Sequence, residues 1–149
     1  MIKKVKVIIR GLKKADLIEG SGYFETLAFL TKAPVIEIGK AKQIFERFKQ
    51  TGKIVYVAEV EGKGIVCTLA LLIEQKFIHG GKPVAHIEDV VTKKEWEKKG
   101  IASKLMEIAI KKAKQQGCYK VILDCSPENV KFYESFDAYK CEIQMRRDL

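Results

Sequence analysis

The sequence predicts a single α/β domain with a central mixed, mostly antiparallel twisted sheet flanked by helices. Its 149 residues are enough for one sizeable core. Hydrophobic residues make up 47% and charged residues 32%, an ordinary balance for a globular protein. The apolar pattern switches between strand-like and helix-like periods in the order β-α-α-β-β-β-α-β-α-β, without a linker or an internal repeat. We therefore assign residues 1–149 to one domain.

The first half of the chain is predicted to contain two helices and three strands. Residues 5–10 alternate apolar and charged side chains, as a half-buried strand does. Asp16 begins a capping-box pattern that favours a helix over 16–30, although two glycines within it weaken this prediction. Apolar residues at helical spacing predict a helix over 37–50. Two β-rich runs around a Glu-Gly-Lys-Gly turn then predict a hairpin with strands over 54–60 and 65–73.

The second half is predicted to begin with a loop over 74–85, which contains two glycines and a proline. A strand follows over 86–91. Apolar residues at helical spacing predict a helix that begins at Ile101 and that Gly117 ends. The remaining runs predict a strand over 119–123, a short helix over 129–135 and a last strand over 139–145.

Charge and cysteine content limit the partners and the compartment. The net charge of +9 favours anionic partners, but the lysines are spread along the chain, as on an ordinary solvated surface. No apolar run approaches the roughly 20 residues of a membrane span, and the N-terminus lacks the apolar core of a secretory leader. The four cysteines have no C-x-x-C spacing, and the two histidines do not cluster with them. We therefore expect a cytoplasmic protein with reduced thiols and no metal site.

The turn from Glu97 to Ala102 has the features of an anion site. It lies between a predicted strand and a predicted helix, whose first amides have no acceptor within the helix. Gly100 leaves room for a ligand to approach the backbone, and Lys98 and Lys99 add positive charge. A phosphate or pyrophosphate is the expected ligand, although a lone glycine before a helix is more often plain structure. Neither the Walker nor the dinucleotide-binding glycine pattern is present.

The segment EKKGIA (97–102) resembles the pyrophosphate-binding turn of the GCN5-related N-acetyltransferases, and the predicted order of elements is similar to that fold. Four further segments resemble the glucosamine 6-phosphate N-acetyltransferases of this superfamily: LAFLTKAP (27–34), EQKFIHG (74–80), HIEDVV (86–91) and GCYKVILDCSPENVKFYESF (117–136). The resemblance covers nearly the whole chain. It implies direct transfer of the acetyl group of acetyl-CoA to the amine of D-glucosamine 6-phosphate in a ternary complex, for UDP-N-acetylglucosamine synthesis. It also implies a homodimer with sugar sites at its interface.

The same resemblance implies a set of site residues. The implied cofactor-binding residues are Val90, Val91, Glu97, Lys98, Lys99, Gly100, Ile101, Ala102, Asn129 and Tyr133. The implied substrate-binding residues are Thr31, Lys76, Phe77, Ile78, His79, Glu88, Asp89, Asp124, Arg146 and Arg147. A lysine suits a phosphate as a point charge, and the two arginines are alternatives for a fork on the same group.

Three of these residues are expected to be catalytic. An amine must be neutral to attack a thioester, so we expect Glu88 to relay its proton. Asp89 is adjacent on a predicted strand, should point to the opposite face, and is expected to contact a hydroxyl or support the structure. Asp124 follows an apolar strand, where a carboxylate is costly unless it is used or paired; the resemblance implies that it orients the amine. Tyr133 is expected to protonate, or hydrogen-bond to, the departing thiolate of CoA.

The chain also departs from the family pattern, and other functions stay open. Glu97 stands where the family usually carries Arg or Gln, and Asp137-Ala138 replaces the usual Gly-Phe. Alternatives are an acetyltransferase for another small amine or a protein N-terminus, an inactive module that keeps acetyl-CoA, and a basic nucleic-acid-binding domain. The segments at 74–80 and 86–91 favour the sugar phosphate. No nucleic-acid partner is expected, because Tyr56 and Trp96 are isolated aromatic residues.

Overall fold

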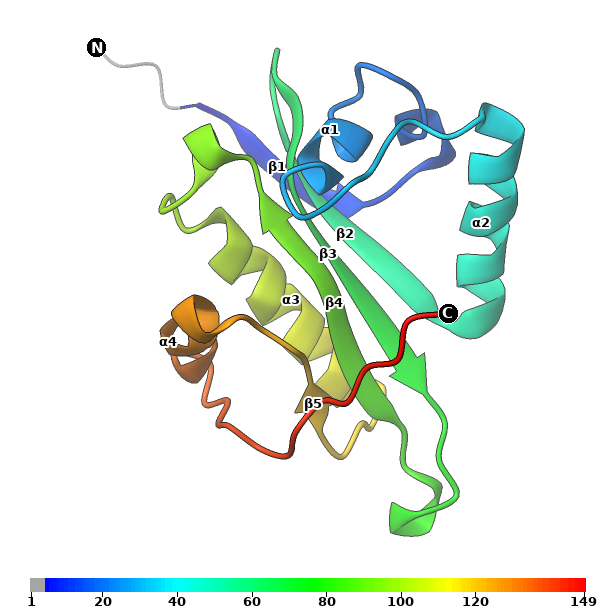
Figure 1. The fold of residues 1–149 in the computed structure, drawn as a ribbon, viewed down its shortest axis with the longest axis vertical. Helices are drawn as coiled ribbons and strands as arrows, with labels where there is room; N and C mark the ends of the chain where they lie inside the picture. Colours follow the sequence, from blue (N-terminus) through cyan, green and yellow to red (C-terminus); the bar gives the residue numbers. More distant parts are fainter. Residues whose placement is uncertain (1–4) are drawn as a thin grey trace.

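The computed structural model describes residues 5–149 and contains one five-stranded sheet in the order β1-β2-β3-β4-β5 (Figure 1). The strands are β1 (Val7–Gly11), β2 (Lys53–Val60), β3 (Gly64–Glu74), β4 (Val84–Thr92) and β5 (Val121–Ile122). The first four pair antiparallel, and β5 pairs parallel to β4. This confirms the predicted mixed, mostly antiparallel sheet.

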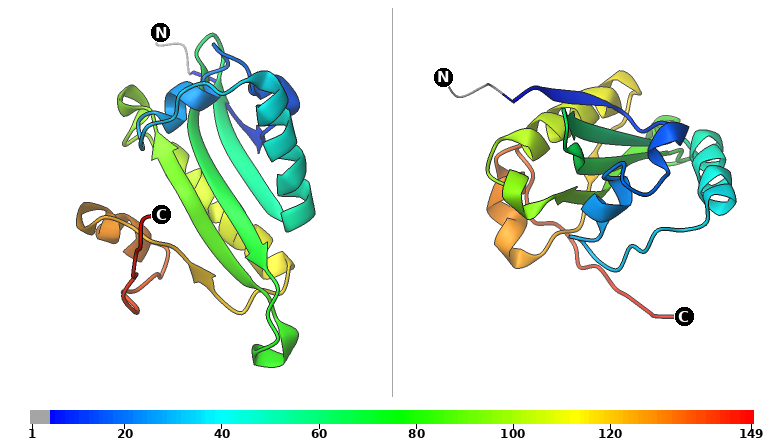
Figure 2. Two further views of the ribbon diagram at one scale, coloured as in Figure 1. Left: turned by 45° about the vertical axis from the view of Figure 1, so that its right-hand side comes forward. Right: turned by 90° about the horizontal axis from the view of Figure 1, so that it is seen from above.

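Helices cover both faces of the sheet, as Figure 2 shows from two further directions. They are α1 (Tyr23–Leu27), α2 (Ile38–Thr51), α3 (Ile101–Gln115) and α4 (Val130–Glu134). Short 3-10 turns, η1 (Lys14–Asp16), η2 (His79–Gly81), η3 (Lys94–Trp96) and η4 (Pro127–Asn129), connect them to the strands. The predictions of α2, the β2–β3 hairpin, α3 and a short helix near residue 130 are confirmed.

The core consists of two apolar clusters on opposite faces of the sheet. One packs Leu105 and Met106 of α3 against Leu69 of β3. The other packs Phe24 of α1 and residues of α2 against the neighbouring Ala70. Because successive side chains of a strand point to opposite faces, β3 serves both clusters, and this explains its almost uninterrupted apolar sequence.

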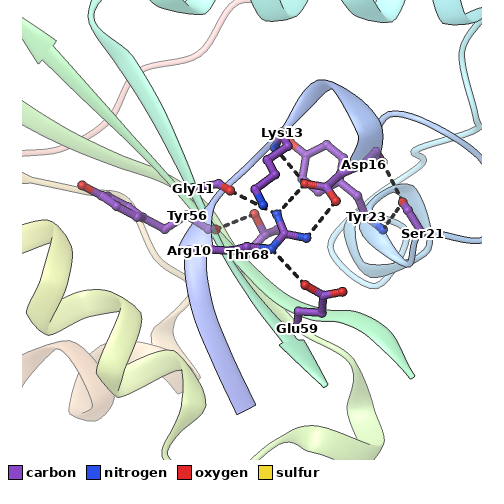
Figure 3. Close-up of polar contacts among 9 residues, drawn as sticks. All are labelled: Arg10, Gly11, Lys13, Asp16, Ser21, Tyr23, Tyr56, Glu59 and Thr68. Atoms are coloured by element: carbon purple, nitrogen blue, oxygen red, sulfur yellow. Dashed lines mark hydrogen bonds and ion pairs between the residues drawn. The ribbon is translucent and has the colours of Figure 1, made fainter. Parts of the chain in front are cut away.

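The predicted helix over 16–30 is wrong in its extent, because only five residues, Tyr23–Leu27, are α-helical. Gly22 adopts φ +92, and a Cβ there would lie 2.5 Å from the carbonyl oxygen of Ile65. Asp16 does not cap this helix. Its carboxylate instead accepts bonds of 2.7 and 2.8 Å from the Arg10 guanidinium and of 2.8 Å from the Lys13 amide (Figure 3). These contacts tie the segment before α1 to β1.

The predicted last strand over 139–145 is also wrong, because this segment forms no strand in the described chain. Its large apolar side chains alternate along the sequence, yet they are almost fully exposed: Tyr139 81%, Ile143 85% and Met145 88%. The strand predicted over 119–123 shrinks to Val121–Ile122, and β4 begins at Val84, two residues before the predicted start. A strand needs a partner, and within residues 5–149 the segment 139–145 pairs with no strand of the sheet.

Candidate functional site

The edge of β4 that faces β5 is open over most of its length. β4 pairs with β3 from Val84 to Thr92, but with β5 only at Ala85 and His86. Beyond these two residues the strands separate (Figure 1). Residues 87–92 therefore present backbone groups without a sheet partner on that side, as far as the described chain goes. Val90 and Val91, two predicted cofactor residues, lie on this stretch.

A bulge at Asp89 changes which face its neighbours occupy. The β3–β4 register shifts between Thr68, which pairs with Val91, and Ala70, which pairs with Glu88. Asp89 itself adopts φ +52. Paired residues of antiparallel strands project to the same face, so Glu88 lies on the face of Ala70. Asp89 lines the same cavity as Ala70, and the prediction that Glu88 and Asp89 point to opposite faces is therefore wrong.

The turn before α3 leaves consecutive backbone amides free. Lys98 and Gly100 both adopt left-handed φ values, +57 and +74. Within the described chain, the amides of residues 98–103 donate no hydrogen bond, and they precede the 15 residues of α3. A Cβ at Gly100 would meet no atom within 4 Å, so the space in front of the turn is open. These amides and the dipole of α3 make a site for a phosphate or pyrophosphate.

The charged side chains of this turn do not block it. Glu97 is exposed, and its amide donates to the Lys94 carbonyl across 3.3 Å, outside the run of free amides. The Lys99 ammonium lies 5.2 Å from the centre of the Trp96 ring, a cation–π contact that holds a positive charge beside the turn. The backbone geometry for an anion is therefore present in spite of the acidic residue at 97.

Tyr133 and Asn129 lie on α4 and η4, on the other side of the gap between β4 and β5. Burial raises the pKa of the Tyr133 phenol, and the nearby Cys125 adds to this, so the phenol keeps its proton at neutral pH. The Asn129 side-chain amide donates to the Ser126 hydroxyl across 3.1 Å. A protonated phenol here can serve as a hydrogen-bond donor or an acid.

Asp124 is exposed, which removes the premise that its carboxylate sits in a costly apolar position. It accepts a hydrogen bond of 2.7 Å from the side-chain amide of Gln144 in the C-terminal segment. The apolar residues before it were the misleading signal, because β5 ends at Ile122 and the chain then leaves the sheet. Its role toward the amine stays a prediction.

The β3–β4 loop holds Lys76 in an ion pair that the sequence did not reveal. The Lys76 ammonium lies 2.5 Å from Glu74 Oε1, and His86 Nε2 lies 2.6 Å from Glu74 Oε2. The hydrogen bond from Lys76 lowers the pKa of the Glu74 carboxyl most, and the hydrogen bond with His86 is the second cause. Both missed residues begin segments quoted above, EQKFIHG and HIEDVV, but only the β3–β4 register places them side by side.

The remaining predicted substrate residues are spread over the surface. Phe77 and Ile78 are exposed at the tip of the loop, and the ring of His79 stacks on Tyr119 with 4.1 Å between centroids. The Arg146 guanidinium forms an ion pair with the Asp148 carboxylate across 2.6 Å. Arg147 and Thr31 are exposed, and Lys76 is partly exposed.

These residues do not form one pocket within a single chain. Thr31 follows α1, and Lys76 to His79 belong to the loop around η2. Figures 1 and 2 place α1 and η2 toward opposite ends of the long strands. Glu88 and Asp89 lie between them on β4. One chain therefore brings together the cofactor-side residues but not the whole predicted substrate set.

Two further findings concern metals and membranes. Among residues 5–149, no three His, Cys, Asp or Glu side chains are grouped so that they could hold a metal ion. In the same part of the chain, no helix has the length and apolar character needed to span a bilayer.

An open strand edge beside a helix that presents free amides is an arrangement for a cofactor with an extended arm and phosphates. The chain belongs to the acetyltransferase (GNAT) family, whose sequence profile matches residues 24–138. Among its relatives is the glucosamine 6-phosphate N-acetyltransferase of Trypanosoma brucei brucei, which is 35% identical over 147 residues and covers 97% of each chain. The enzyme of that name from Arabidopsis thaliana is 35% identical over 142 residues, covering 93% of this chain and 94% of the relative.

Solved structures agree with these relatives. A crystal structure of a Trypanosoma brucei acetyltransferase matches with a TM-score of 0.91 at 34% identity, covering 97% of this chain and 100% of that one. The structure of glucosamine-6-phosphate N-acetyltransferase from Arabidopsis thaliana matches with a TM-score of 0.90 at 34% identity, covering 96% and 98%. The predicted GCN5-related N-acetyltransferase fold is thereby confirmed.

Proposed function

We propose that this protein transfers the acetyl group of acetyl-CoA to the amine of D-glucosamine 6-phosphate, giving N-acetylglucosamine 6-phosphate for UDP-N-acetylglucosamine synthesis. The observation that carries the proposal is the run of free amides at residues 98–103, next to the open edge of β4. The names of the relatives, which match over nearly the full chain, support the choice of acceptor.

The residues around the gap fit acetyl-CoA. The free amides of residues 98–103, a run that includes Ile101, would hold the pyrophosphate. The backbone of Val90 and Val91 would pair with the pantetheine arm, as one strand pairs with another. Asn129 and Tyr133 would border the thioester. Bound there, acetyl-CoA supplies an activated acyl group, and no metal is required.

The proton of the attacking amine is assigned to Glu88. This carboxylate is exposed on β4, one residue before the bulge, and can accept the proton directly or through water. Asp124, held by Gln144, would orient the amine. The Tyr133 phenol, which its environment keeps protonated, would donate to the leaving thiolate. No covalent intermediate on the protein is needed for this direct transfer.

The sugar phosphate is assigned to a site that two copies of the chain complete. Two observations support a homodimer: Thr31 and the loop Lys76 to His79 lie far apart in one chain, and the apolar residues of 139–145 are exposed. An extended segment with alternating apolar residues is suited to add a strand to a partner's sheet. Lys76 and either Arg146 or Arg147 would then bind the 6-phosphate.

We further place the protein in the cytoplasm as a single domain. All four cysteines are unpaired, which suits a reducing compartment. Sheet pairing connects every strand from β1 to β5, and this supports one domain.

Release of free thiol from acetyl-CoA tests the proposed reaction. Glucosamine 6-phosphate, glucosamine and glucosamine 1-phosphate are offered as acceptors under the same conditions. We expect thiol release with the 6-phosphate and little with the other two, because both lack the group that Lys76 and the arginines would hold. Absence of release with all three acceptors would contradict the proposal and make Glu97 the first residue to examine.

A further inference from the structure

The paired side chains of Glu74 and His86 lie on the same face of the sheet as Glu88, the proposed proton acceptor. His86 pairs with Leu72 of β3, and Glu88 pairs with Ala70. Ala70 and Leu72 are two residues apart on β3, so both pairs project to the face on which α1 and α2 lie. Two residues of a strand span about 6.6 Å, so one water molecule can connect the side chains of His86 and Glu88.

The contact with Glu74 determines which ring nitrogen of His86 carries a proton. His86 Nε2 lies 2.6 Å from Glu74 Oε2. The hydrogen bonds from Lys76 and, less strongly, with His86 lower the pKa of the Glu74 carboxyl, so this group is a carboxylate and can only accept. Nε2 must therefore donate, which leaves Nδ1 to accept a proton. The His86 side chain is 24% exposed, and within residues 5–149 its Nδ1 makes no hydrogen bond, so water can reach this atom.

The proposed acetyl transfer has one proton to release. An ammonium acceptor brings three protons: one stays on the amide nitrogen of the product, one ends on the thiol of CoA, and the third has to reach solvent. Glu88 would be covered by the bound sugar, and a carboxylate is a weaker base than an imidazole. A histidine next to Glu88 can take this proton, and a carboxylate on its other nitrogen stabilises the imidazolium that forms.

We propose that His86 carries the third proton from Glu88 to solvent, and that Glu74 is the positioning residue that fixes its ring. The proton passes from the amine to Glu88 and then, through a water molecule, to His86 Nδ1. Its release from Nδ1 to solvent restores the neutral ring. This inference rests on the proposed function, because it needs an amine that loses its proton at Glu88. The charged residues around the ring are Glu74 at the end of β3, Lys76 in the loop after it, Glu88 on β4 and Asp124 beyond Ile122, the β5 partner of His86.

Replacing His86 by glutamine separates the hydrogen bond from the proton transfer. The glutamine amide can still donate to Glu74, but it cannot take up a proton. With glucosamine 6-phosphate, we expect His86→Gln to lower the kcat of thiol release about a hundredfold, a usual contribution of a proton-transfer group, and to leave the KM for acetyl-CoA unchanged. In His86→Ala, imidazole added to the buffer should restore kcat. His79→Ala is the matched control, because His79 is the other of the two histidines and any loss there should not respond to imidazole.

The outcomes separate this inference from the reaction on which it rests. An active enzyme whose kcat His86→Gln leaves unchanged would overturn the proton path alone. So would a lower kcat in His86→Ala that imidazole does not restore. An unmodified protein that releases no thiol with any acceptor would overturn the proposed function and the proton path together.

A measurement on the free protein tests the orientation of the ring without turnover. In protein with ¹⁵N-labelled histidine, at a pH where the ring is neutral, NMR shows which nitrogen carries the proton, and we expect Nε2 for His86. Glu74→Gln should weaken this preference, because an amide can donate as well as accept. Glu107→Gln, at an exposed position of α3, should not change it. A proton on Nδ1 in the unmodified protein, or no difference between the two variants, would overturn the role of Glu74.

Discussion

Replacing Gly100 by alanine separates the strain of a left-handed residue from the loss of a ligand site. Gly100 precedes α3 with φ +74, and Gly117 follows α3 with φ +72. An added Cβ would meet no atom within 4 Å at either position. The left-handed conformation should cost each alanine variant about 1–2 kcal/mol of stability, and steric contact should add nothing. The two variants are therefore matched in everything except the ligand.

The kinetic consequences should differ. At Gly100 the new methyl group enters the space assigned to the pyrophosphate, so the KM for acetyl-CoA should rise about tenfold or more, equivalent to about 1.4 kcal/mol. At Gly117 the KM should stay at its original value. Urea unfolding measures the stability of both variants, and thiol release measures the KM. Equal KM values in the two variants would refute the assignment of the turn to the cofactor.

Three further predictions concern other parts of the chain. Gly22→Ala should destabilise the protein by about 3 kcal/mol in urea unfolding, more than Gly100→Ala or Gly117→Ala. The alanine would be left-handed, as in those two variants, and its Cβ would in addition lie 2.5 Å from the Ile65 carbonyl oxygen. Burial would raise the pKa of Asp16, but the bonds from Arg10 and the Lys13 amide lower it overall, so the carboxylate stabilises the fold fully at neutral pH and this stabilisation disappears as the pH falls from the ordinary aspartate range through the lowered folded-state pKa. Asp16→Asn should therefore cost about 1–3 kcal/mol of stability at pH 7 and make the stability less dependent on acid pH. An unaltered dependence of stability on acid pH in this variant would contradict the assignment. Lys76→Gln should raise the KM for glucosamine 6-phosphate about tenfold and leave that for acetyl-CoA unchanged, whereas equal changes in both would contradict a phosphate contact.

Local signals in the sequence were sufficient where neighbouring residues determine the structure. The helix α2 has apolar residues at helical spacing and ends at Gly52 in the left-handed conformation, and the β2–β3 hairpin has a turn rich in glycine. These elements were predicted to within one residue at each end.

The errors arose where distant parts of the chain decide the structure. The segment before α1 is shaped by the contact of Gly22 with the Ile65 backbone, which no local pattern reveals. The bulge at Asp89 is a property of the β3–β4 register, and so is the meeting of Glu74 with His86.

The candidate site divides in the same way. The turn around Gly100 could be predicted because the glycine, the lysines and the helix start are contiguous in the sequence. The distribution of Thr31 and Lys76 over opposite ends of the sheet could not, because it depends on strand order and strand length.

The most direct test follows the acetyl group itself. Acetyl-CoA carrying a ¹³C-labelled acetyl group is incubated with the protein and glucosamine 6-phosphate, and the product is examined by NMR. We expect the label to appear in an amide on the amino nitrogen of the sugar, in amounts equal to the thiol released. Label that appears only as free acetate, or on the protein, would contradict acetyl transfer to this amine.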